Sequence, residues 1–417
     1  MTTPRPSTSV SGGVVLLLAT ALIAGACQEA QERKSEGVSS TQASTRDWQS
    51  ACEDRLSSTR PSREVAYPLV LEARWRIDPD PPLGPIVGLA WDPAHSRILV
   101  ADNSVSEISI LDTLGRRLGT IGRYGEGPGD IDLKNVDGGT NRLALLPNGE
   151  IAITDVRHLK VFAPDGQVLK RLRVDSSSTL DRFDMQLEAT SEGDLIAVRT
   201  GKQHVGALDL DERTRLTLVR VNATSPTSTM TVLGDLKNSY SLLKPSNPFP
   251  GYQPYRRGYR RSWGAYPSGV VAESWRYFGL CYFDWTGRVI AAHAVGARRV
   301  QVDAAERKRV LMEEMGGPGP VPFLHTTAEA LYRENWPEEG PLYVDLVVRD
   351  DGLVWALRWS PESKQIVDVF DPSGYQGSFS PRQRGLPLLL RDSLAFWADA
   401  EAGDVTVDAT HQARAAQ

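Results

Sequence analysis

The sequence predicts an all-β protein, a six-bladed β-propeller whose blades are four-stranded antiparallel sheets. Short segments of alternating apolar and polar residues recur along the chain between Asn-Gly, Asp-Gly and Ser-Gly turns, which is the pattern of successive β-hairpins. The 417 residues include 36 glycines and 27 prolines, which favours many turns over long helices. Hydrophobic residues make up 41% of the chain and charged residues 24%, ordinary values for a globular protein with a sizeable core.

The repeat is clearest in residues 141–174, where the turns Pro147-Asn148-Gly149 and Pro164-Asp165-Gly166 separate apolar segments. The same arrangement recurs in about residues 86–121, 185–221, 264–294, 343–379 and 386–409. Corresponding turns at Gly149 and Gly193 lie 44 residues apart, which is the spacing of a propeller blade. A two-sheet sandwich would not produce paired turns at such a period, so the sequence favours six sheets arranged radially.

Residues 67–77, YPLVLEARWRI, are predicted to close the ring by pairing as a strand with the last blade. We therefore assign residues 63–411 to the propeller, with insertions at about 236–261 and 303–336 and a disordered tail at 412–417. The second insertion, between blades 4 and 5, is predicted to contain two short helices. Asp303 can cap the first, which stops at Gly316-Gly317, and Thr326 with Glu329 forms a capping box for the second.

The N-terminus is predicted to be an export signal, residues 1–26, rather than part of the fold. Residues 14–23, VVLLLATALI, form an apolar core too short to span a bilayer. The following Ala24-Gly25-Ala26-Cys27 resembles the lipobox of bacterial lipoproteins, which implies a diacylated Cys27 and, with Gln28 next, the outer membrane. A plain cleaved secretory signal is the alternative. The polar residues 27–62 are then expected to form a flexible tether.

The stretch GRYGEGPGDI, residues 122–131, raises the question of a nucleotide site because glycines let a backbone approach phosphate closely. The dinucleotide fingerprint fails, since its third glycine position is Asp130 and no helical pattern follows. Pro128 also removes an amide that a phosphate-binding loop would use. The stretch is therefore interpreted as a corner from the outer strand of one blade to the inner strand of the next.

Residues 110–131, ILDTLGRRLGTIGRYGEGPGDI, resemble the repeat of NHL-type six-bladed propellers. The segment GEGPGD in particular is similar to one found in bacterial six-bladed propeller lipoproteins. This resemblance extends over most of the chain and implies the fold, but it implies no particular activity, since propellers have many functions.

Two cysteines remain after Cys27. Cys52 and Cys281 can pair in an oxidising compartment. Alternatively, Cys281 is a buried free thiol in an apolar strand. The sequence leaves both alternatives open.

Related propeller families include metal-dependent lactonases and lyases, so a metal enzyme with its site in the central channel is the alternative function. None of the six histidines lies in a short metal-ligand pair. His158, His204 and His293 are the only ones placed where they could reach the channel. We predict no catalytic residue, no bound metal and no cofactor.

One segment has an unusual composition, with arginines interleaved with aromatic residues. Its members are the candidate ligand-binding residues Tyr252, Tyr255, Arg256, Arg257, Tyr259, Arg260, Arg261 and Trp263. Arginine binds carboxylates and phosphates, and tyrosine and tryptophan offer rigid contact area; a loop that packs on the ring is the alternative. The net charge of −5 is too small to indicate nucleic acid. We expect a lipid-anchored binding or scaffold module for an envelope protein or an anionic or carbohydrate-like ligand.

Overall fold

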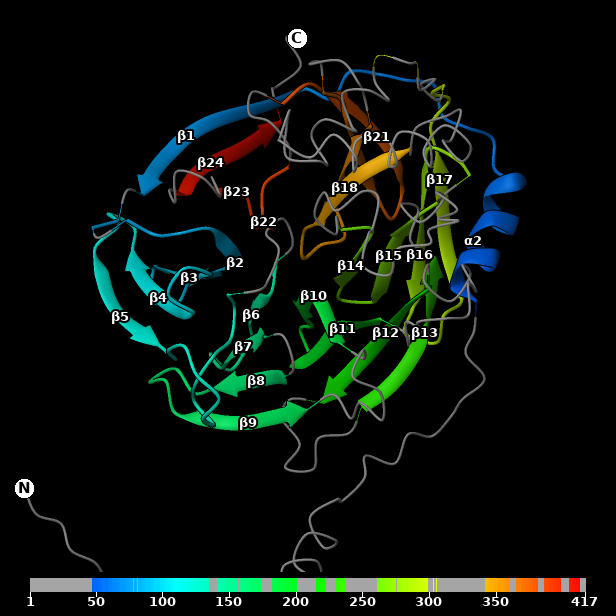
Figure 1. Ribbon diagram of the computed structural model, residues 1–417. Coiled ribbons are helices and arrows are strands. Elements are labelled where there is room, and N and C mark those ends of the chain that lie inside the picture. The colour runs from blue at the N-terminus through cyan, green and yellow to red at the C-terminus, as the bar shows by residue number, and fades with distance from the viewer. Residues whose placement is uncertain are drawn as a thin grey trace, which may run out of the picture. The chain divides into compact units, whose positions relative to one another are not determined.

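Six four-stranded antiparallel sheets surround a common centre in the computed structural model (Figure 1). The structure describes residues 47–77, 79–80, 82–134, 141–155, 158–173, 182–200, 215–222, 230–237, 261–274, 276–298, 303, 305, 342–359, 365–381, 386–398 and 405–412. All of them belong to one unit, Thr41–Gln417. The predicted fold class is confirmed.

The first three blades follow one another along the chain. Blade 1 contains β2 (Ile86–Asp92), β3 (Arg97–Asp102), β4 (Glu107–Asp112) and β5 (Arg117–Ile121). Blade 2 contains β6 (Leu143–Leu145), β7 (Ile151–Thr154), β8 (His158–Phe162) and β9 (Val168–Arg173). Blade 3 contains β10 (Arg182–Ala189), β11 (Asp194–Thr200), β12 (Arg215–Asn222) and β13 (Met230–Lys237).

The last three blades complete the ring. Blade 4 contains β14 (Trp263–Tyr266), β15 (Gly269–Glu273), β16 (Gly279–Asp284) and β17 (Val289–Ala294). Blade 5 contains β18 (Tyr343–Val348), β19 (Val354–Arg358), β20 (Val367–Asp371) and β21 (Gly374–Phe379). Blade 6 contains β22 (Leu389–Arg391), β23 (Leu394–Ala398), β24 (Val405–Gln412) and, as its fourth strand, β1 (Leu69–Ile77). β24 thus extends one residue into the expected tail.

Acidic residues at strand ends hold the recurring hairpins. The carboxylate of Asp112 accepts hydrogen bonds from the amides of Leu114 and Arg116, and that of Asp284 does the same for Thr286 and Arg288. Such a side-chain cap replaces backbone hydrogen bonds that a tight turn cannot make. The recurrence of this contact in blades 1 and 4 shows that the predicted repeat is structural.

The ring closes as predicted, through the N-terminal strand. β1 pairs antiparallel with β24, from Leu69 opposite Gln412 to Ile77 opposite Val405. A register shift between Ala73 and Trp75 interrupts the ladder once. β1 therefore covers the edge of β24, which would otherwise present unpaired backbone groups.

The innermost strands are β2, β6, β10, β14, β18 and β22, and neighbouring members of this set contact one another around the centre. Backbone hydrogen bonds join several of these blades, from the Arg142 amide to the Val87 carbonyl (3.1 Å) and from the Leu346 amide to the Arg261 carbonyl (2.9 Å). Apolar side chains fill the space between blades; between blades 6 and 1, Trp91 packs on Phe396 with ring centroids 5.7 Å apart. This packing excludes water from the inter-blade contacts.

The expectation of a flexible tether through residue 62 is wrong for its last part. Residues 48–57 form the helix α2 (Trp48–Ser57), which the Asp47 side chain caps. Trp48 is fully buried and stacks on Phe283 of blade 4. An added Cβ at Gly234 or Gly287 would overlap the Trp48 indole, so these glycines leave room for the ring. Burial of a tryptophan supplies the free energy that a wholly polar tether lacks.

A disulfide fixes α2 to the ring. Cys52 on the helix is bonded to Cys281 on β16, with an S–S distance of 2.12 Å. The chain then follows blade 4, where Ser62 bridges to Val295 after β17, and blade 5, where Ala66 bridges to Ser378 in β21, before it becomes β1. Residues 47–77, called here the N-terminal belt, therefore begin between blades 3 and 4 and then contact blades 4, 5 and 6 in succession.

The glycine-rich stretch is a corner, as interpreted from the sequence. It leads from β5, the outer strand of blade 1, to β6, the inner strand of blade 2. Of its glycines, Gly122 has a positive φ of 78°. An added Cβ at Gly125 or Gly127 would instead overlap the carboxylate of Asp130, which accepts a hydrogen bond from the Gly127 amide (2.8 Å). The carboxylate of Asp130 thus occupies the position beside the glycines where a phosphate-binding loop would hold an anion.

Several expected features lie outside the described residues: the signal peptide and Cys27, most of the first insertion, the two expected helices in 303–336, and residues 413–417. Among the residues that are described, no helix has the length and apolar character needed to cross a membrane.

Reduction of the Cys52–Cys281 disulfide should lower the free energy of unfolding by about 2–5 kcal/mol, because the bond closes a loop with a sequence separation of 229 residues. Urea unfolding with and without a phosphine reductant measures this change. The double variant Cys52→Ser/Cys281→Ser is the control, and its midpoint should not respond to reductant. An unchanged wild-type midpoint after verified loss of the disulfide would contradict the expectation.

Candidate functional site at the inner strands

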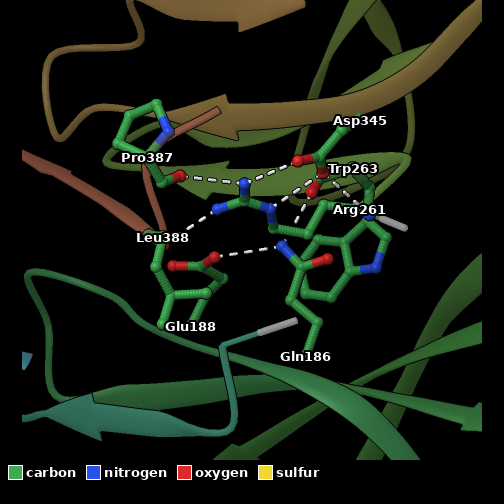
Figure 2. Close-up of polar contacts among 7 residues, drawn as sticks. All are labelled: Gln186, Glu188, Arg261, Trp263, Asp345, Pro387 and Leu388. Atoms are coloured by element: carbon green, nitrogen blue, oxygen red, sulfur yellow. Dashed lines mark hydrogen bonds and ion pairs between the residues drawn. The ribbon is translucent and has the colours of Figure 1, made fainter. Parts of the chain in front are cut away.

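Polar side chains gather where the inner strands of blades 3, 4 and 5 meet the start of blade 6 (Figure 2). Gln186 and Glu188 lie on β10, Arg261 lies two residues before β14, and Asp345 lies on β18. We call these four residues the inner-strand polar cluster. Gln186 and Glu188 are separated by one residue, so the period of a strand places both side chains on the same face.

Arg261 is the centre of this cluster and is only 4% exposed. Its Nε and Nη2 donate to the two carboxylate oxygens of Asp345 at 3.0 and 2.8 Å. Its Nη1 donates to the Leu388 carbonyl at 2.8 Å, and its Nη2 also donates to the Pro387 carbonyl at 2.9 Å. Figure 2 shows the guanidinium between these acceptors. One side chain thus joins blade 4 to blades 5 and 6.

The planar guanidinium suits this task because its donors match a carboxylate on one edge and carbonyls on the other. A buried charge that loses its partner costs about 3–5 kcal/mol. Arg261 therefore stabilises the ring, and its hydrogen-bonding capacity is almost fully used within the protein.

The prediction that Arg261 and Trp263 bind a ligand at the rim is therefore wrong for these two residues. Trp263 is 1% exposed and packs in the core next to Cys281. Trp263 begins β14, the first strand of blade 4, and Arg261 lies two residues before it; this strand faces the centre of the ring. The other candidates, Tyr252, Tyr255, Arg256, Arg257, Tyr259 and Arg260, lie outside the described residues.

Glu188 and Gln186 differ from Arg261, because each has one side-chain oxygen that accepts no hydrogen bond from the described residues. The Gln186 carboxamide donates from Nε2 to Glu188 Oε1 at 3.0 Å and to the Trp263 carbonyl at 2.8 Å. Within the described part of the chain, no group donates a hydrogen bond to Glu188 Oε2 or to Gln186 Oε1. The pair therefore presents two acceptor oxygens, one at each outer end of the Gln186–Glu188 hydrogen bond (Figure 2).

Burial raises the pKa of Glu188 to about 7, although the positive charges of Arg261 and Arg391 act in the opposite direction. The negative charge of Asp350 adds to the increase. Asp350 itself is paired with Arg391 of blade 6 at 2.6 Å, and burial also raises the pKa of Asp350. Asp345 and Asp350 each have an arginine partner, whereas Glu188 has none in the described structure. Glu188 is thus a carboxyl group that changes its charge near neutral pH.

Of the three histidines predicted as possible metal ligands, the two that the structure describes do not lie on inner strands. His158 lies on β8, the third strand of blade 2, and burial lowers its pKa. His293 lies on β17, the outer strand of blade 4, where its Nε2 is 3.1 Å from the Pro372 carbonyl oxygen. His204 lies outside the described residues. Among the residues described, no three His, Cys, Asp or Glu side chains are grouped so that they could hold a metal ion.

One feature of the sequence points to the inner-strand polar cluster. Gln186 and Glu188 are polar residues two positions apart in a segment predicted to be the first strand of a blade. First strands face the centre, so polar residues there line the channel rather than the surface. The partner Asp345 follows the same rule in blade 5, but only the closed ring brings it to Arg261.

The unfolding free energy should depend on pH through Glu188. Its pKa of about 7 lies above the ordinary value of 4.5, so the folded protein binds more protons than the unfolded chain between these pH values. The contribution of Glu188 to stability should therefore fall by about 3 kcal/mol as pH rises from below 4.5 to above 7, and stay constant beyond that range. In the variant Glu188→Gln this part of the dependence should be lost, as measured by urea unfolding at pH 5 and pH 8.

The matched control is Glu126→Gln, which changes an exposed glutamate in the corner after blade 1. It should retain the wild-type difference between the two pH values. If Glu188→Gln retained the same difference, the assignment to Glu188 would be wrong.

Comparisons with known proteins support the architecture. No protein-family model and no curated protein sequence matches the chain. A solved structure of a DUF4221 family member from Bacteroides vulgatus ATCC 8482 is similar, with a TM-score of 0.51 and 10% identity over 84% of this chain and 100% of that one.

Two further solved structures are similar at lower scores. A protein assigned as exported from Bacteroides fragilis NCTC 9343 has a TM-score of 0.48 and 11% identity over 84% of this chain and 99% of that one. A gluconolactonase from Xanthomonas campestris has a TM-score of 0.40 and 11% identity over 85% of this chain and 99% of that one. At these identities the likeness concerns the fold alone: the chain is an all-β, six-bladed propeller with four-stranded antiparallel blades.

Proposed function

We propose that the protein is an exported, lipid-anchored binding module whose ligand is carbohydrate-like and donates hydrogen bonds to Glu188 and Gln186. The observation that carries the proposal is the pair of acceptor oxygens, Glu188 Oε2 and Gln186 Oε1, which no described group engages. A carboxylate and a carboxamide can each accept a hydrogen bond from a different hydroxyl group of one sugar, because each oxygen has lone pairs for a donor. The rigid inner strands hold the two oxygens in position before the ligand arrives.

The charges of the site favour a ligand that donates hydrogen bonds over an anionic one. Arg261 and Arg391 are each bonded to a carboxylate of the protein itself. An anion at Glu188 would meet a carboxyl group that is negative above neutral pH, with no uncommitted cation among the four residues of the cluster. A neutral sugar or an amino sugar avoids this repulsion.

The disulfide supports export. Structural disulfides persist in oxidising compartments such as the periplasm and are rare in reducing ones. The Cys52–Cys281 bond therefore agrees with the predicted signal peptide and with attachment to the envelope through Cys27, at the outer membrane on its periplasmic or surface side. The metal-dependent lactonase- or lyase-like alternative has no supporting ligand group among the described residues.

Titration calorimetry against neutral sugars, amino sugars and gluconate tests the proposed ligand class. We expect at least one neutral or amino sugar to bind the wild type, and Glu188→Ala to bind it about tenfold or more weakly, because a hydrogen bond to a charged group is lost. Glu126→Ala is the control and should bind as the wild type does. The absence of binding by any sugar, or preferential binding of gluconate, would contradict the proposal.

The anchor has its own test. Full-length protein expressed in a bacterium with an alkyne-bearing fatty acid should take up the label and sediment with membranes. Cys27→Ser should take up no label and should be released, because the acyl chains supply the membrane affinity. Equal labelling of both proteins would rule out Cys27 as the attachment site.

A further inference from the structure

A pocket of about 220 Å³ opens between blades 5 and 6 and shares no residue with the inner-strand polar cluster. Its walls come from three parts of the chain. Arg349, Leu353 and Trp355 belong to the hairpin of β18 and β19, Tyr67 and Leu69 to the N-terminal belt, and Thr410 and His411 to the end of β24. The pocket therefore exists only when β1 has closed the ring.

The polar wall of this pocket has a guanidinium group with free donors. Arg349 donates from Nε and Nη2 to the two carboxylate oxygens of Asp351, at 2.9 and 2.6 Å. Its Nη1 donates no hydrogen bond within the described structure, and about three quarters of the side chain is buried. One edge of the guanidinium is thus held in place by Asp351, and the other edge remains available for a second acceptor.

Four of the other lining residues are aromatic or apolar: Tyr67, Trp355 and the two leucines. Trp355 is 1% exposed, and its indole N–H has no acceptor among the described residues. Its indole ring therefore contributes apolar contact area to the pocket rather than an accessible hydrogen-bond donor. The His411 ring, 47% exposed, adds a further hydrogen-bonding group at the mouth.

We propose that this pocket binds a small organic carboxylate whose apolar part packs on the aromatic wall and whose carboxylate oxygens accept hydrogen bonds from Arg349. The volume is below the roughly 300–1,000 Å³ of sites for drug-sized ligands. A ligand the size of a single ring with one carboxylate fits this limit. The preorganised guanidinium supplies the geometry for a carboxylate, which a lysine would not.

Benzoate is the probe, and benzamide, which has nearly the same shape without the charge, is the control ligand. Titration calorimetry should detect benzoate binding to the wild type with a dissociation constant of about 1 mM or lower and no comparable binding of benzamide. Arg349→Gln should weaken benzoate binding about tenfold or more. Asp351→Asn should bind benzoate as tightly as the wild type or more tightly, because it frees the same guanidinium from its internal partner.

The two variants remove opposite ends of one ion pair, so loss of the pair alone would affect them equally. Melting curves of both variants confirm that they fold. No benzoate binding by the wild type, equal binding of benzamide, or equal weakening in Arg349→Gln and Asp351→Asn would overturn the proposal. Benzoate binding should persist in Glu188→Ala, which keeps this result independent of the sugar experiment.

Discussion

The pairing of β1 with β24 is the interaction on which the rest of this structure depends. Blade 6 takes three strands from the C-terminal end of the chain and one from the N-terminal end. Without β1, the backbone groups along the outer edge of β24 would have no hydrogen-bond partners. Blades 5 and 6 would also lose the side chains that residues 67–77 place between them. Ring closure therefore depends on long-range pairing. The chain loses loop-closure entropy before the hydrogen bonds and apolar contacts of this pairing can stabilise the fold.

The N-terminal belt offsets part of that entropy cost. It is bonded to blade 4 through Cys52 and Cys281 and bridges to blade 5 at Ala66 before it reaches β24. The Glu64 side chain adds an ion pair with Arg358 of blade 5 at 2.6 Å. Each of these contacts shortens the free segment between the ring and β1. The pairing of β1 with β24 then closes a shorter loop and costs less entropy.

The buried charges of the molecule divide into two kinds. Arg261 is surrounded by acceptors from blades 5 and 6 and serves the architecture. Glu188, on the same inner surface, is bonded only to Gln186 among the described residues. A protein gains stability by satisfying buried polar groups, so a group that remains partly unsatisfied on a rigid strand is a reasonable place to expect a ligand. The same contrast appears within Arg349, where Nε and Nη2 bond to Asp351 and Nη1 has no partner among the described residues.

The sequence by itself determined the blades. Turn residues and period-two alternation are local, and they predicted the strand–turn order of all six sheets, because hairpins form between neighbours in the chain. The closing role of residues 67–77 was predicted from the propeller architecture, in which the last blade needs a further strand. The tertiary structure alone decided the rest. The polar residues 48–57 became a helix because Trp48 found a site beside Gly234 and Gly287. Arg261 became a structural residue because ring closure placed Asp345 and Leu388 around it. Side-chain contacts of this kind, between residues 80 or more positions apart, leave no local pattern, so no periodicity in the sequence could reveal them.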